Sequence, residues 1–187
     1  MGRLAQTLGL AGEAVLYLQA TKKAIAALGL DPDSLSPPSE STAPLGNWIT
    51  NVVPIGKRQA YLFVNCRTLL SFPILIGKQK PVLQDMPQFL HHGLLQLAQW
   101  LKFSKYNMEL VTTGLDKIAF CVNEDKSLLA VVRSLAADYA HRIQLSHELQ
   151  GKSLESIIPA INSTPRAKLG YKTSAEITLE VLRASVA

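Results

Sequence analysis

Residues 45–65, LGNWITNVVPIGKRQAYLFVN, contain the pattern that decides the fold. Two runs rich in β-branched and aromatic residues, Trp48–Ile55 and Gln59–Asn65, stand on either side of a short turn at Gly56–Arg58. A third run of this kind, Thr68–Ile76, begins two residues after the second run ends. Short turns between β-rich runs predict an antiparallel meander.

The middle run predicts a central strand that is covered on both sides. Tyr61 and Phe63 point to one face of a strand, and Leu62 and Val64 point to the other, because side chains alternate along a strand. Apolar residues on both faces are typical of a strand buried between two layers. We therefore expect an α+β fold, a small antiparallel β-meander packed with helices.

Length and composition predict a single domain over residues 1–187. Apolar residues make up 48% of the chain and charged residues 18%, which is enough apolar surface for a substantial core. Residues 31–46 are rich in Pro and Ser and predict a flexible loop. The meander follows at 47–76, and residues 85–187 are expected to be mainly helical.

A short strand is expected at Val15–Gln19, and apolar residues at helical spacing predict the helices. The expected helices lie at 21–28, 86–103, 127–143 and 153–161, with a last helix starting at Thr173. Capping side chains are expected at Thr21, Asp85, Ser127 and Thr173. The last of these forms a capping box with Glu176. Asp138 and Arg142 are expected to pair at i,i+4 spacing.

The positive charge is concentrated in the middle of the chain. The net charge is +5, and residues 48–108 hold seven Lys/Arg against one acidic residue. Lys57 and Arg58 lie in the first turn of the meander, and Lys78 and Lys80 follow its third run. Alternate connections of a meander reach the same end of the sheet, so these four side chains form the candidate contact for an anionic partner.

A second set of candidate contact residues is more scattered. It consists of Trp48, Arg67, Arg166, Lys168 and Lys172. An exposed tryptophan beside basic residues could stack on a nucleic-acid base. Aromatic residues on strands are more often core, and we expect Trp48 to pack the meander against a helix.

Catalytic signatures are weak, and we expect no cofactor and no metal site. His141 and His147 do not have the i,i+4 spacing of a helical zinc pair, and no Gly-x-Ser-x-Gly elbow is present. Cys66 and Cys121 are expected to be reduced structural thiols. A zinc site that joins them to distant histidines, or a Cys–His nucleophile pair, stays open as an alternative. No apolar run approaches the ~20 residues of a membrane span, so a cytoplasmic protein without a membrane partner is expected.

Two motifs near the N-terminus resemble a bacterial family of unknown function. Thr21-Lys22-Lys23 follows a short strand, and Leu45-Gly46-Asn47-Trp48 is followed by Asn51. Members of that family typically read C-T-K-K-L and L-G-D-W-Y-A-N-L before a basic hairpin, and this chain departs from the pattern at Ala20, Asn47 and Ile49. The resemblance implies a bacterial or mobile-element accessory protein and brings no established activity.

The tail NSTPRAKLGYKTSAE, residues 162–176, is similar to the end of integrase-type bacterial transposases. Those enzymes carry Asn-x-x-Pro-Arg-x-x-Leu-Gly-Tyr-x-Thr-Pro-Ala-Glu, and Ser174 stands here in the usual proline position. They also need three metal-binding carboxylates on their sheet, whereas Asp85 is the only acidic residue in 48–108. We therefore expect no transposase chemistry from this tail.

Together these patterns predict a non-catalytic binding or regulatory module that acts through contacts with another protein. The alternative is a nucleic-acid-binding accessory factor in a mobile-element or defence system. An enzyme with an unrecognised site is the third hypothesis.

Overall fold

The computed structural model describes residues 15–55, 58–77, 83–115, 117–123, 125–148 and 154–186. Its centre is a five-stranded sheet in the order β4-β3-β2-β1-β5. The strands are β1 (Leu16–Ala20), β2 (Trp48–Ile55), β3 (Arg58–Asn65), β4 (Ser71–Leu75) and β5 (Ile118–Val122). The helices are α2 (Lys22–Leu28), α3 (Met86–Trp100), α4 (Lys105–Val111), α5 (Lys126–Glu148), α6 (Leu154–Asn162) and α7 (Ser174–Ala184). Short 3-10 turns are η1 (Pro32–Ser34), η2 (Leu83–Asp85) and η3 (Ala167–Leu169).

The predicted meander is confirmed. Strands β2, β3 and β4 pair antiparallel in sequence order, with Trp48 opposite Asn65 and Phe63 opposite Phe72. Residues 60–65 of β3 are all buried, as expected for a strand with a neighbour on each edge and a layer on each face. The α+β fold class predicted from the sequence is therefore correct.

The sheet is larger than a meander, and it is mixed rather than purely antiparallel. The expected N-terminal strand, β1, pairs parallel with β2, and an unexpected strand, β5, pairs parallel with β1. The stretch Ile118–Val122 is half-buried along most of its length and carries a weak local signal. It becomes a strand because it can pair with the free edge of β1. This is a long-range effect, so local strand propensity does not predict it.

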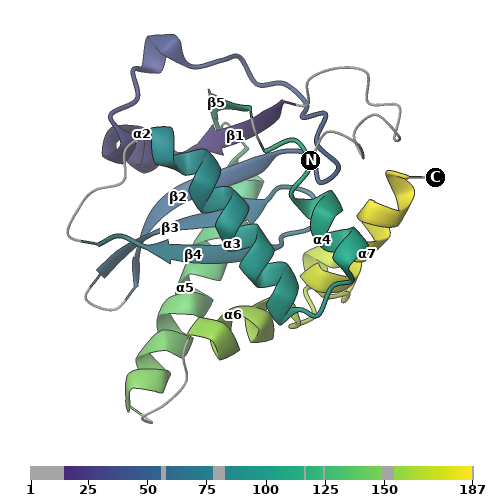
Figure 1. Cartoon of the computed structure of the whole chain (residues 1–187). Helices are drawn as coiled ribbons and strands as arrows, with labels where there is room; N and C mark the ends of the chain where they lie inside the picture. The colour runs from purple at the N-terminus through teal and green to yellow at the C-terminus, as the bar shows by residue number, and fades with distance from the viewer. Residues whose placement is uncertain are drawn as a thin grey trace.

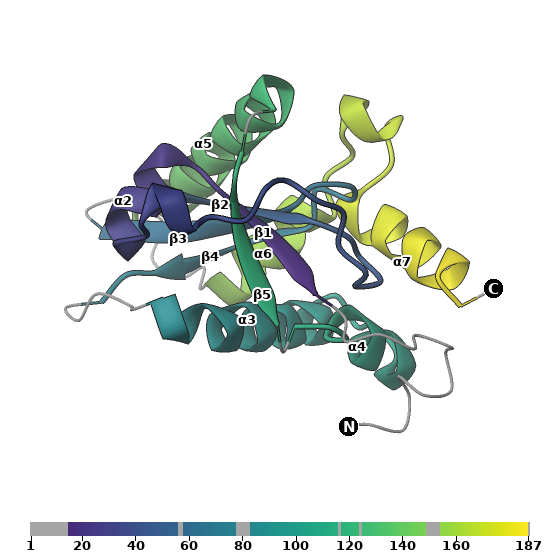
Figure 2. The same cartoon turned by 90° about the horizontal axis from the view of Figure 1, so that it is seen from above.

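Helices cover both faces of the sheet (Figures 1 and 2). In the view from above, α3 and α4 lie on one face, and α2 and α5 lie on the other. Helix α6 follows the β4 edge and contacts α3, α5 and β4, while α7 packs against α4. One cluster of buried residues joins all of these elements.

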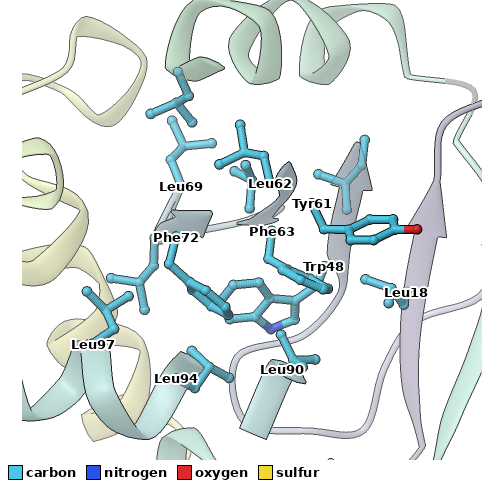
Figure 3. Packing of buried hydrophobic residues seen from close by; sticks show 14 of the residues in the cluster. Leu18, Trp48, Tyr61, Leu62, Phe63, Leu69, Phe72, Leu90, Leu94 and Leu97 are labelled. Carbon is cyan, nitrogen blue, oxygen red and sulfur yellow. The ribbon is translucent and has the colours of Figure 1, made fainter. Parts of the chain in front are cut away.

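An aromatic layer fills the space between the meander and α3. Phe63 and Phe72 stack with ring centroids 5.3 Å apart, and Trp48 lies tilted against Phe72 at 6.1 Å. Figure 3 shows these three rings above Leu90 and Leu94 of α3. This packing confirms that Trp48 joins the meander to a helix.

The outer edge of β4 is closed by a side chain that is 91 residues away in sequence. The Ser71 N–H donates to Oδ1 of Asn162 at 2.8 Å, and Nδ2 of Asn162 donates back to the Ser71 carbonyl at 2.8 Å. Tyr139 of α5 donates to the same carbonyl at 2.8 Å. Further along this edge strand, Pro73 has no N–H to offer. These contacts tie α5, α6 and the sheet together.

Two predicted helix ends are confirmed and four details are wrong. Thr21 caps α2, and Gly29 ends it with a left-handed φ of 64°. Asp85 stands directly before α3, but its side chain makes no capping hydrogen bond. Helix α5 is capped by Asp125, whose Oδ1 accepts from the N–H groups of residues 127 and 128, and not by the expected Ser127. The helix predicted over 86–103 ends at Trp100, since Lys102 has a positive φ. Asp138 pairs with a residue far along the chain and not with its i+4 neighbour.

Gly93→Ala should destabilise the protein by about 1–3 kcal/mol, although glycine-to-alanine changes within helices normally stabilise. The reason is that a methyl group at position 93 would overlap the Phe72 ring. Urea unfolding monitored by circular dichroism measures the change. Gly77→Ala is the matched control, because nothing lies near its added methyl group, and it should be neutral or slightly stabilising. Equal effects of the two changes would contradict the close packing of α3 on β4.

Candidate functional site

The C-terminal part of the chain forms a compact turn at residues 166–172, which we call the basic turn. Its ends are joined by an antiparallel bridge, in which the Arg166 N–H donates to the Lys172 carbonyl at 3.1 Å. Between them η3 makes one turn, and Gly170 and Tyr171 follow with φ values of 64° and 63°. Thr173 then starts α7 with the predicted capping box. The polypeptide therefore enters and leaves the basic turn through defined hydrogen bonds.

Three basic side chains fasten this turn to neighbouring helices. The Arg166 guanidinium contacts Oδ2 of Asp138 at 3.3 Å, and Lys172 contacts Glu180 at 2.8 Å. Lys168 Nζ donates to the Ser127 hydroxyl at 3.0 Å. The structure thus brings together Arg166, Lys168 and Lys172, which the sequence had suggested only as separate contacts. The Arg166 side chain is only 15% exposed, so its main contact is within the protein.

Tyr171 is the most exposed large apolar residue among those described. It is 79% exposed, and its left-handed backbone costs an L residue roughly 1–2 kcal/mol. Leu169, in the same turn, packs against the core instead. An aromatic ring held outward at a cost in stability is a candidate contact residue. Sequence reasoning missed this role, although the aromatic residue after glycine and between two lysines was a visible signal.

The other proposed contacts are dispersed. Arg58 and Arg67 are both exposed, but they lie at opposite ends of β3 because one precedes the strand interior and the other follows its last residue. Lys57, Lys78 and Lys80 lie outside the described residues, so the candidate cluster around Arg58 stays a prediction.

The hypothesis that Trp48 stacks on nucleic-acid bases is wrong. Its side chain is 1% exposed and is covered by α3, because the ring completes the aromatic layer under that helix. A ring in this position has no face left for a nucleic-acid base.

The two N-terminal motifs meet in space. Thr21 Oγ1 donates to Oδ1 of Asn51 at 2.6 Å and accepts from the Ala24 N–H at 3.3 Å. One hydroxyl therefore caps α2 and ties it to β2, which is a structural role for both motifs. Lys22 and Lys23 are exposed in the first turn of α2.

Burial disfavours the thiolate form of both cysteines. Burial raises the pKa of the Cys66 thiol to about 12, and burial also raises the pKa of Cys121. Because the thiolate is the reactive species, a raised pKa lowers reactivity at neutral pH. Among the residues that the structure describes, no three metal-ligating side chains come together.

Residues 17–177 match a family described as Domain of unknown function (DUF6933). The chain belongs to this family. The match runs from β1 to the first turn of α7 and confirms the expected membership in a family without known function. Comparison of this DUF6933 chain with curated proteins gives no match.

Among solved structures, the chain is similar to the catalytic core domain of BIV integrase in its crystal form I. The two share 15% sequence identity with a TM-score of 0.46, over 75% of this chain and 97% of that chain. In the described part of the DUF6933 chain, no helix is both long and apolar enough to span a membrane.

Thiol labelling at pH 8 should be at least a hundredfold slower in the native protein than in urea. A thiol with a pKa of about 12 has roughly three orders of magnitude less thiolate at this pH than an unfolded cysteine, whose pKa is about 8.5. Absorbance with a disulfide reagent follows the reaction, and Cys66→Ser and Cys121→Ser assign its phases. Fast native labelling of either cysteine would favour the Cys–His nucleophile alternative.

Proposed function

We propose that this DUF6933 chain is a non-catalytic binding module that acts through contacts with another protein. The observation that supports the proposal is Tyr171, exposed on a turn whose backbone is held in place on both sides. The resemblance of the N-terminal motifs adds to this proposal the role of a bacterial or mobile-element accessory protein.

A rigid, exposed tyrosine suits a protein interface for two reasons. Tyrosine is enriched among the residues that contribute most to binding, because it combines a large apolar area with a hydroxyl group. The Arg166–Asp138 and Lys172–Glu180 contacts and the capping box hold the turn before a partner arrives. Little conformational entropy is then lost on binding, which favours affinity.

The surroundings of Tyr171 support a particular chemistry for the partner. Lys168 and Lys172 lie on the same turn, and Lys172 is about half-exposed even in its ion pair. A protein with a pocket for the tyrosine ring and carboxylates around that pocket would complement this surface. We therefore propose a partner with an acidic binding site.

Binding to nucleic acid is the second candidate function, and the same turn provides its specific observation. An exposed aromatic ring between two lysines could stack on a base while the lysines contact phosphates. Arg166 and Lys172 already contact carboxylates, which weakens their attraction for phosphate and for a partner's carboxylates alike. The predicted cluster of Lys57, Arg58, Lys78 and Lys80 would be a further phosphate contact in this case.

Site-specific photocrosslinking tests the proposal. Replacing Tyr171 with a photoreactive phenylalanine keeps an aromatic ring at the tip of the turn. Irradiation of cells that express this variant should give a discrete adduct with one protein, and the adduct should resist nuclease. The matched control is Tyr106 on α4, which is also exposed, at 44%, and should give no such adduct.

Two further measurements make the outcome decisive. Tyr171→Ala and Lys168→Glu should each weaken binding of the crosslinked partner by at least tenfold, while circular dichroism shows that the fold is retained. The second candidate function would be established by two results together. The variant would form an adduct with nucleic acid, and changing Lys57 and Arg58 to Glu would abolish binding of nucleic acid by the protein. No adduct at position 171 would contradict both roles for the turn.

A further inference from the structure

An uncharged surface spans α3, the β4 edge and α6, and we call it the neutral face. Helix α3 (15 residues) and strand β4 (5 residues) contain no charged side chain. Helix α6 (9 residues) contains only Glu155, whereas 18% of the whole chain is charged. The exposed side chains of α3 are instead three amides and one imidazole, those of Gln88, His92, Gln96 and Gln99.

A groove lies in the middle of the neutral face. It has a volume of about 250 Å³, and its walls come from all three elements. The residues that shape it include Phe72, Phe89, Trp100, Leu154 and Ile158, with His92 and Gln96 at its side. Phe89, Trp100 and Leu154 are only partly buried within this chain. Further burial of these side chains by a second molecule would therefore be favourable.

Among the described residues, charges lie at the edges of the neutral face. Asp85 stands at one end of α3 and Lys102 just beyond the other end, while Glu155 lies in the first turn of α6. Protein interfaces have this arrangement, with a core depleted of charge and a polar rim. Interfaces between identical chains show the depletion most clearly.

The absence of charge also indicates which partner fits. In a twofold dimer the same surface meets itself, so every charge near the axis faces a like charge. The chain carries a net charge of +5, so like charges that face each other across such an axis would add to the repulsion between two copies. The neutral face avoids that repulsion. We propose that it is the interface of a symmetric homodimer, formed by packing α3 and α6 of one copy on those of the other.

The geometry favours a contact through side chains and not through continuation of the sheet. On the β4 edge, Asn162 occupies the N–H and carbonyl of Ser71, and Pro73 lacks an N–H. A strand from a second copy could therefore not form the regular hydrogen bonds of a sheet with β4 at these positions. The basic turn contacts α5, on the opposite side of the sheet from α3, so the dimer would leave Tyr171 accessible. The dimer proposal is therefore independent of the proposed function.

Sedimentation of the full chain tests the dimer. The wild-type protein should sediment at twice the chain mass at micromolar concentration. Gln96→Lys combined with Gln99→Lys adds four positive charges to the interface of a dimer and should raise its dissociation constant at least tenfold. Both positions are exposed, and Lys has about the same helix propensity as Gln, so circular dichroism should report an unchanged fold.

Two comparisons make the experiment decisive. Ser134→Lys with Gln144→Lys adds the same charge to exposed positions of α5 and should leave the dimer intact. Mixing the Gln96→Lys/Gln99→Lys protein with a Gln96→Glu/Gln99→Glu protein should restore a dimer, because opposite charges then meet across the interface. A monomeric wild-type protein, or a dimer that the lysines on α3 do not weaken, would overturn the proposal.

Discussion

The carboxamide of Asn162 is the contact on which the arrangement of the helices depends. It forms hydrogen bonds with both backbone groups of Ser71 and with the Ile158 carbonyl, and in this way it replaces a neighbouring strand at the β4 edge. Tyr139 reaches the same Ser71 carbonyl from the other side. All of these groups are buried, so an unmade hydrogen bond would be costly and the network specifies a single arrangement. Helix α6 and the turn that follows it are thereby held at fixed positions relative to the sheet.

This arrangement gives the molecule two surfaces of different character. The basic turn begins four residues after Asn162 and is fastened to α5 through Asp138 and Ser127. The neutral face lies where α6 approaches α3, with the groove between them. Charged and aromatic residues at an exposed turn favour a specific contact, whereas an uncharged helical face favours a permanent one. One polar contact at the edge of the sheet therefore positions both candidate interfaces.

The candidate site could be predicted only in part. Positive charge alone identifies three residues of the basic turn as candidates, because charged side chains can be read from any sequence; these are Arg166, Lys168 and Lys172. Their partners were not predictable, because Asp138, Ser127 and Glu180 meet them only after α5 and α7 have packed. Trp48 is a candidate stacking residue in the sequence because it is aromatic and close to basic residues. In the structure the hydrophobic effect places its large ring under α3. Tyr171 stays outside because its turn is anchored by Leu169 instead.

Local patterns by themselves determined the three strands of the meander and the ends of several helices. The Thr21 cap and the Thr173–Glu176 capping box depend on atoms within four residues, so composition and spacing are sufficient to predict them. Only the tertiary structure decided the strand at Ile118–Val122, the partner of Asp138 and the role of Asn162. Each of these depends on groups tens of residues apart, which come together when the core excludes water and buried polar atoms must find partners.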